Sequence, residues 1–196
     1  MSAFSQRGRA VQDPALVRAL FNNPRLAGFW LAARLWLGYQ WIEAALHKTE
    51  NPAWMVTGNA LKEFWNSAVT IPVEGRAPIS LDWYRSLIQF MLDARAYSWF
   101  AKLVAYGELL VGIALILGAF TGIAAFFGAV MNWNLMLAGS ASANPLLFVV
   151  ALGLIMAWKI AGYFGMDYFL LPIIGTPWGW AGKVRQTRSV TETIKA

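Results

Sequence analysis

The sequence has no cysteine, a single histidine and few charges. Of its 196 residues, 13% are charged and 58% are hydrophobic, so the charged share is about half that of an ordinary soluble domain. The missing cysteines exclude disulfides, thiol chemistry, cysteine-ligated zinc and iron–sulfur clusters, and the lone His47 excludes a haem held by two histidines of this chain. We therefore expect no metal site, and any redox role must borrow its cofactor.

The net charge is positive, at a formal +6. A basic surplus suits either nucleic acid or an anionic membrane surface, and the apolar excess favours membrane lipid over nucleic acid as the partner. Residues 1–25 carry charges and a proline without a central apolar stretch or a small-residue cleavage site, so we expect no signal peptide.

Four apolar stretches are long enough to cross a bilayer, whose core takes roughly 20 helical residues. The fourth begins with Asn144 and Pro145, where the Asn side chain can accept a free backbone N–H and proline fits the first helical turn. Only a glycine-bracketed turn separates the second from the third, which must therefore form an antiparallel hairpin. The sequence predicts an all-α integral membrane protein, an antiparallel four-transmembrane-helix bundle, with spans at residues 26–46, 98–119, 121–139 and 144–162.

Charge outside these stretches predicts the topology. Residues 1–25 and the tail from residue 164 onward are net positive, whereas the loop 48–97 has five bases and five acids. Positive-inside bias places both termini in the cytoplasm and this loop outside the cell membrane. We divide the chain into a cytoplasmic N-terminal segment with a short interfacial helix (1–25), a four-helix transmembrane domain (26–175) and a basic cytoplasmic tail (176–196).

Three segments outside the spans show a helical period of apolar residues, which predicts short amphipathic helices. With Trp54 and Trp83 beside two of them, we expect the external loop to cap the bundle; a surface that docks a partner is the alternative. The apolar positions are Leu16, Val17, Leu20 and Phe21; Leu61, Phe64, Trp65 and Ala68; and Tyr84, Leu87, Ile88 and Met91.

Ionised side chains near mid-bilayer cost about 3 kcal/mol each, so each needs a partner or a purpose. At 1.5 Å per residue, Arg34 should lie roughly 12 Å from the cytoplasmic edge and Glu108 roughly 15 Å from the outer edge. Because both fall in the same middle layer, we expect an ion pair between Arg34 and Glu108.

Further polar and aromatic residues predict a pocket in the outer half of the bundle. An aromatic wall with a few hydrogen-bonding groups suits a quinone head group, whose carbonyls accept hydrogen bonds and whose ring stacks. A carboxylate or histidine nearby can exchange the protons of quinone reduction. The catalytic candidates are Glu108, Arg34, Glu43 and His47, and the candidate quinone- or substrate-binding residues are Gln40, Trp41, Lys102, Tyr106, Asn132, Trp133 and Asn134.

Several motifs resemble those of the DoxX-like membrane proteins. They are residues 34–38 (RLWLG), residues 107–112 (GELLVG) and the turn 118–122. The sequence is more closely similar to the DoxD branch, the membrane subunit of thiosulfate:quinone oxidoreductase, through residues 41–48, 52–54, 58–65, 131–145 and 165–167. The resemblance covers roughly residues 26–175.

The resemblance implies a four-helix membrane protein that passes electrons from thiosulfate to a bound, exchangeable membrane quinone, with a second subunit. His47, Lys48 and Lys102 would supply positive charge for the thiosulfate dianion. Two alternatives remain open: a non-catalytic accessory subunit of a larger respiratory or photosynthetic complex, and a small-solute or proton pathway. The buried polar residues also allow a purely structural reading, since Asn often joins membrane helices and Lys can snorkel to water.

Overall fold

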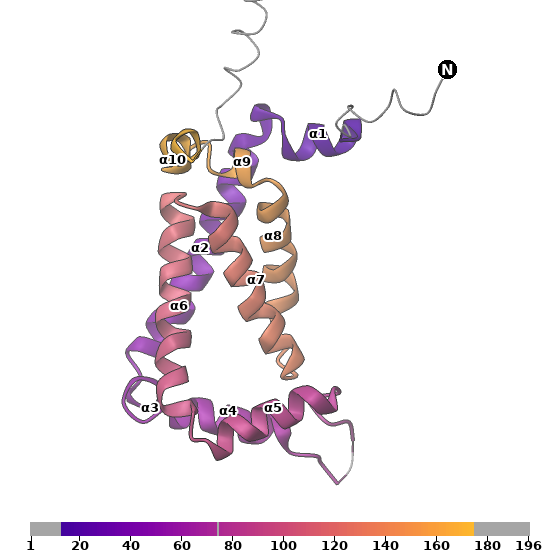
Figure 1. The fold of residues 1–196 in the computed structure, drawn as a ribbon, viewed down its shortest axis with the longest axis vertical. Helices are drawn as coiled ribbons and strands as arrows, with labels where there is room; N and C mark the ends of the chain where they lie inside the picture. Colours follow the sequence, from indigo (N-terminus) through magenta and orange to yellow (C-terminus); the bar gives the residue numbers. More distant parts are fainter. Residues whose placement is uncertain (1–12, 74, 175–196) are drawn as a thin grey trace, which may run out of the picture.

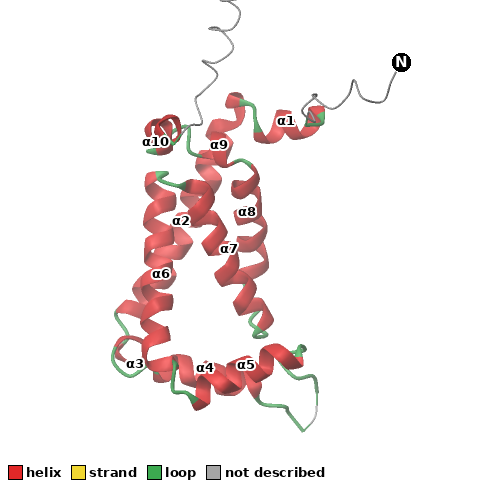
Figure 2. Cartoon of the chain, in the orientation of Figure 1, coloured by secondary structure: helices red, strands yellow, loops and turns green. Residues whose placement is uncertain are grey.

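The computed structural model describes residues 13–73 and 75–174, and in these ranges the chain is helical without strands (Figure 2). Residues 1–12 and the tail 176–196, expected in the cytoplasm, lie outside the described ranges. The helices are α1 (Ala15–Phe21), η2 (Pro24–Leu26), α2 (Ala27–Thr49), α3 (Pro52–Met55), α4 (Asn59–Val69), α5 (Asp82–Asp93), α6 (Tyr97–Leu117), α7 (Thr121–Leu137), α8 (Asn144–Met156), α9 (Trp158–Ala161) and α10 (Asp167–Ile173).

Four helices, α2, α6, α7 and α8, run along the long axis of the molecule (Figure 1). Helices α4 and α5 lie across one end, and α1, α9 and α10 lie at the other. The first and last described helices are therefore at the same end of the bundle.

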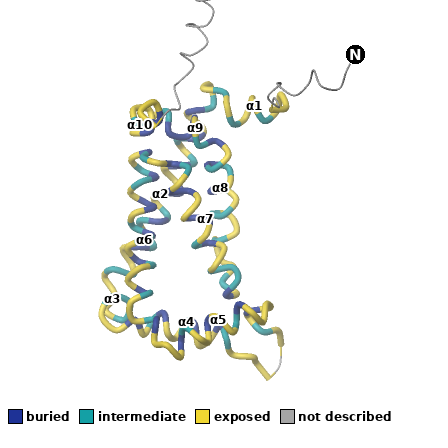
Figure 3. Tube along the Cα trace, viewed as in Figure 1, coloured by how far each residue is buried: buried dark blue, intermediate teal, exposed yellow. Residues whose placement is uncertain are grey.

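Only α6 is, among the described residues, both long and apolar enough to cross a membrane by length and composition. Helices α7, with 17 residues, and α8, with 13, are apolar but shorter. The fourth predicted stretch was too long, because α8 ends at Met156 and α9 starts only after Ala157. Large apolar side chains nevertheless stay exposed on α6, α7 and α8, for example Leu110, Phe127 and Val149. Figure 3 shows that exposed residues recur along the length of these helices.

The closest helix pair is α2 with α6, because two glycines face each other at the crossing. A Cβ on Gly112 would come within 3.0 Å of the Gly38 carbonyl oxygen and 2.6 Å of Ile42 Cγ1. Small residues at a helix crossing let the two backbones approach closely. Substitution at either glycine would push α2 away from α6.

The turn between α6 and α7 forms the predicted hairpin. Gly118 is left-handed with φ 66°, and Ala119 N–H donates to the Ala114 carbonyl at 2.9 Å, the bond that closes a Schellman motif. At the next turn, α8 begins at Asn144 with Pro145 in its first turn, as predicted. The Asn144 side chain, however, caps nothing: its amide donates to the Ser140 carbonyl at 2.9 Å.

The segment 48–97 closes one end of the bundle instead of extending away from it. Its buried apolar residues form a core of their own with Ala101 of α6 and Ala138 beyond α7. In α4 the buried residues are Leu61, Trp65 and Ala68, three of the four expected. In α5 the buried face is rotated towards Leu92, and Leu87 is exposed. We call α4 and α5 the cap.

Candidate functional site

A deeply buried acid near the middle of α6, Glu108, forms an ion pair with Lys48 of α2. Lys48 Nζ lies 2.9 Å from Glu108 Oε1 and 2.7 Å from Oε2, and the Glu108 side chain is only 2% exposed. The ammonium also donates to the Ala44 carbonyl at 3.4 Å and lies 5.4 Å from the centre of the Trp54 ring. The hydrogen bonds of the ammonium are thus made to the two oxygens of Glu108 and to the Ala44 carbonyl.

Lys48 reaches so far inward because of its place on α2. Trp41, Ala45 and Lys48 follow one another at helical spacing on the face of α2 that the bundle covers. Side chains on a helix lean towards its N-terminus, so the ammonium of Lys48 points back down the bundle to the level of Glu108. The lysine side chain is still 20% exposed, and it therefore connects the buried carboxylate with the surface.

Arg34 does not pair with Glu108, contrary to the sequence-based prediction. Its Nη2 donates to the Phe164 carbonyl at 3.2 Å, and a Cβ on Gly118 would collide with its Nη1. Arg34 therefore lies level with the end of α6, ten residues or about 15 Å of helix from Glu108. The prediction failed because α2 starts beyond the end of α6, so distances counted from the two helix ends do not refer to a common plane.

A carboxylate near Arg34 holds the end of the bundle opposite the cap. Asp167, 1% exposed, accepts hydrogen bonds from the backbone N–H groups of Phe120 at 2.6 Å and Thr121 at 2.8 Å, which begin α7. Its negative charge also stabilises the Arg34 guanidinium. Arg34 and Asp167 thus tie α2, the α6–α7 turn and α10 together, which is a structural role.

Two polar side chains on the inner faces of α2 and α7 are buried without a protein hydrogen-bond partner. Asn132 of α7 is 0% exposed, and neither its amide nitrogen nor its amide oxygen has a hydrogen-bond partner. The indole N–H of Trp41 is also buried and unpaired. A buried polar group left unpaired costs about 1–3 kcal/mol. These two residues therefore fit a ligand that brings hydrogen-bonding atoms of its own.

Packing against two glycines places these groups in one layer. Trp41 Nε1 lies 3.0 Å from the position of a Cβ on Gly128, and Asn132 follows Gly128 by one turn, about 6 Å, on the same face of α7. On the other side, the sulfur of Met131 lies 3.8 Å from the position of a Cβ on Gly107. Since Gly107 precedes Glu108 and Met131 precedes Asn132, Glu108 and Asn132 lie at about the same level, and Trp41 Nε1 lies about one turn of α7 away. We call Trp41, Lys48, Glu108 and Asn132 the polar layer.

The other predicted site residues do not join the polar layer. Asn134 turns outward, where its carbonyl oxygen accepts a hydrogen bond from the Tyr84 hydroxyl of the cap at 3.1 Å. Gln40 is half-buried. The exposed residues, which face away from the bundle core, are Glu43, His47, Lys102, Tyr106, Trp133 and Asn134. The aromatic wall of the predicted pocket is therefore reduced to Trp41.

Two residues of importance were missed by the sequence-based reasoning about buried charges. The sequence places Lys48 at the start of the external loop, as a cation for thiosulfate, although its spacing from Trp41 and Ala45 indicates the covered face of α2. Asp167 enters only as tail charge and as part of the motif 165–167. In the described part of the chain, no three His, Cys, Asp or Glu side chains lie together in a way that could hold a metal ion.

The chain matches a known protein family. The profile of the DoxX family matches residues 29–140, more than half of the chain. The chain belongs to the DoxX family. No curated protein and no solved structure matches it.

The DoxX match includes the complete polar layer. It runs from the second residue after the start of α2 through the cap, α6 and α7, and it ends before α8. Asp167 lies beyond it. DoxX membership, the apolar α6 and the exposed apolar faces identify a membrane-like helical protein, consistent with a subunit associated with a membrane oxidoreductase.

Proposed function

We propose that this DoxX protein is the quinone-reactive membrane subunit of an oxidoreductase, with the quinone ring bound at the polar layer. The observation that carries the proposal is the Lys48–Glu108 ion pair, which lies at about the level of the unpaired amide of Asn132 because Met131 packs over Gly107. A buried charge pair is weak evidence for stability, since apolar residues often serve the fold equally well. A buried carboxylate with an exchange route to the surface is instead what proton-coupled chemistry needs.

The hydrogen-bonding groups fit both redox states of a quinone. The amide N–H of Asn132 and the indole N–H of Trp41 can donate to quinone carbonyls, and the amide oxygen of Asn132 can accept from a quinol hydroxyl. Reduction adds two electrons and two protons. Glu108 would exchange protons at the ring, and Lys48, partly exposed, would renew them from the capped end of the bundle.

The proposal includes a membrane topology. Helices α2, α6, α7 and α8 would span or enter the plasma membrane, the cap would lie outside, and both termini would be cytoplasmic. The exposed apolar faces of α6, α7 and α8 support burial in lipid, because a large exposed apolar surface is costly in water. The net positive charge of residues 1–25 supports the orientation.

The proposed donor is thiosulfate, as in the DoxD branch that the sequence resembles. The balanced reaction joins two thiosulfates by a new S–S bond: 2 S₂O₃²⁻ + quinone + 2 H⁺ gives S₄O₆²⁻ + quinol. Lys48 is committed to Glu108, so His47 and Lys102, both exposed, are the cations left to attract the dianion, and Glu43 lies one turn from His47 on the same exposed face. A second subunit would contact this surface.

The test is made on the full chain purified in mild detergent. Bound quinone is extracted and identified, and thiosulfate-dependent reduction of a soluble quinone analogue is followed by absorbance. We expect copurified quinone, and at least a tenfold loss of turnover in Glu108→Gln. The matched control is Glu63→Gln, which neutralises an exposed carboxylate of α4 and should retain activity. Absence of quinone together with full activity in Glu108→Gln would refute the proposal.

A second candidate is a non-catalytic accessory subunit of a larger membrane complex. The outward position of Trp36, Tyr39, Trp99, Tyr106 and Trp133 favours it, because aromatic residues concentrate at protein interfaces. Purified protein without quinone or turnover, together with a stable partner after crosslinking in native membranes, would support this second function.

A further inference from the structure

An open apolar groove runs along the outer side of the α6–α7 hairpin. It has a volume of about 400 Å³, and none of the residues that line it is polar. Its lining residues are Leu110, Val111, Ala114, Ala119, Phe120, Ile123, Ala124 and Phe127. A groove of this size lies within the range of small-molecule sites. The apolar lining of the groove suits an aliphatic chain, and it has no side-chain hydrogen-bonding group for a polar ring.

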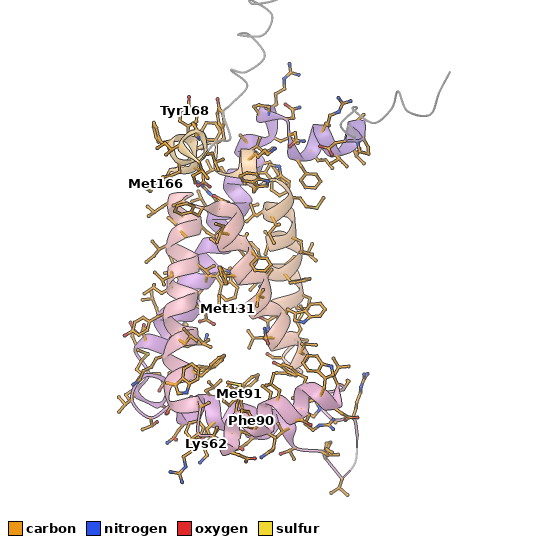
Figure 4. The ribbon with its side chains drawn as sticks, viewed as in Figure 1. Lys62, Phe90, Met91, Met131, Met166 and Tyr168 are labelled. Atoms are coloured by element: carbon orange, nitrogen blue, oxygen red, sulfur yellow. The ribbon has the colours of Figure 1, made fainter. Side chains whose placement is uncertain are left out.

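Along the helix axes, the groove starts within about two turns of the polar layer, although no residue of the polar layer lines it. On α6, the groove residue Val111 follows Glu108 by one turn. On α7, Phe127 precedes Asn132 by five residues, about 7.5 Å of helix. On α7, Met131 falls between Phe127 and Asn132; its flexible side chain lies over Gly107, the residue before Glu108, and Figure 4 shows it between α6 and α7. A thioether side chain can change rotamer at low cost, so it can yield to a passing ligand.

From the level of Glu108, near the middle of α6, the groove leads away from the cap to the α6–α7 turn at the opposite end of the bundle. An amphipathic ligand with its polar end at Glu108 and Asn132 would therefore leave its apolar end in the groove. In the proposed topology this direction runs from mid-bilayer to the cytoplasmic end of the bundle, so the apolar end would lie in the lipid-facing half of α6 that is away from the cap. The unpaired Asn132 amide requires a hydrogen-bonding group at the polar end.

We propose that the α6–α7 groove binds the isoprenoid tail of the quinone, close to its ring, so that the ring enters the polar layer from the lipid side past Met131. This proposal rests on the proposed function, since it assigns the apolar part of the same ligand. It makes the groove a determinant of specificity for tailed quinones over short, soluble ones.

The experiment compares two benzoquinones with the same ring, one with a single isoprenoid unit and one with three. Binding to the full chain in detergent is measured by quenching of tryptophan fluorescence. We expect the wild type to bind the longer quinone at least roughly tenfold more tightly, as burial of several CH₂ groups predicts. Partition into micelles is common to all variants, so the ratio of the two affinities is compared between variants.

Two pairs of variants test the groove. Ala114→Phe fills it, whereas Ile113→Phe adds the same ring at the neighbouring exposed position outside it. Phe127→Ala removes one wall, whereas its control Phe126→Ala removes an equally exposed ring that does not line the groove. We expect the preference for the longer quinone to fall to within about twofold in Ala114→Phe and to decrease in Phe127→Ala. Binding of the short quinone and both controls should match the wild type.

The outcomes separate the two proposals. Saturable quenching by both quinones with an unchanged preference in Ala114→Phe overturns the groove and leaves the proposed function standing. Equal loss of both quinones in Ala114→Phe also overturns the groove, because the filling would then act on the ring site. Quenching by neither quinone in the wild type refutes the proposed function itself. A tightly bound phospholipid lost only in Ala114→Phe, with the quinone preference unchanged, identifies a lipid chain as the occupant and overturns the proposal.

Discussion

Replacement of Lys48 by Met leaves Glu108 buried without its counterion, and this perturbation tests the polar layer most directly. Glu108 is 2% exposed and both of its oxygens are bonded to the ammonium. Loss of one partner of a buried ion pair costs about 3–5 kcal/mol. For a chain of this length that lowers Tm by roughly 6–20 °C.

The converse substitution, Glu108→Gln, should cost less. Lys48 is 20% exposed and can turn its ammonium towards water, so only a charged hydrogen bond is lost, about 1.5–3 kcal/mol. The double variant has no buried charge and should be more stable than Lys48→Met alone. The two single effects should therefore be coupled by at least about 1 kcal/mol.

The assay is thermal unfolding of the four proteins in one detergent, followed by circular dichroism. The control is Asp82→Asn, which breaks the exposed ion pair of Asp82 with Arg85 and should leave Tm almost unchanged. Strict additivity of Lys48→Met and Glu108→Gln would refute the reasoning, because it would mean that the two side chains do not depend on each other.

Three further predictions concern other parts of the molecule. Asn132→Leu should leave Tm unchanged or raise it, because an unpaired buried amide is replaced by an apolar group of similar size, while quinone binding is lost; a fall in Tm of more than about 5 °C would show that the amide has a protein partner. Gly118→Ala should unfold the bundle at lower temperature, because the new Cβ would collide with the Arg34 guanidinium, and Gly28→Ala, with nothing within 4 Å, should not. Tyr84→Phe should loosen the cap by about 1 kcal/mol and speed proteolysis between α4 and α5; equal cleavage rates would show that the bond to Asn134 holds nothing. Burial raises the pKa of Tyr84, so its neutral form is favoured in the fold: the stabilisation is complete below the ordinary phenol pKa of about 10 and is lost as pH rises above it, in the wild type but not in Tyr84→Phe.

Turns and amphipathic helices were readable from the sequence because local residues determine them. Gly118 needs a positive φ, and Pro145 fits only a first helical turn, so the hairpin and the start of α8 were correct. The cap helices could be predicted because each has one apolar face. Capping of helix ends by side chains was less predictable. The Asn144 side chain, for example, donates to the Ser140 carbonyl and does not accept from a backbone N–H at the start of α8.

The sequence could not predict which faces of α6 and α7 point into the bundle. Both helices are apolar on nearly every side, so periodicity does not distinguish the core face from the outer face. Polar residues were therefore all expected inside, whereas Tyr106 and Trp133 point outward and Glu108 and Asn132 inward. The partner of Glu108 was missed because it depends on how far Lys48 leans along α2, which is a property of side-chain direction and not of depth.

During synthesis of the chain, the contact of Arg34 with Phe164 can form only late. The carbonyl that accepts from Arg34 belongs to Phe164, 130 residues later in the chain, and the carboxylate that balances its charge follows at Asp167. A ribosome releases α2 long before either group exists. Until then, the first long helix carries an arginine with nothing to satisfy it, and the nascent bundle stays incomplete. A message truncated before residue 164 would produce a protein that lacks this final closure, and such a product would be a ready substrate for membrane quality-control proteases.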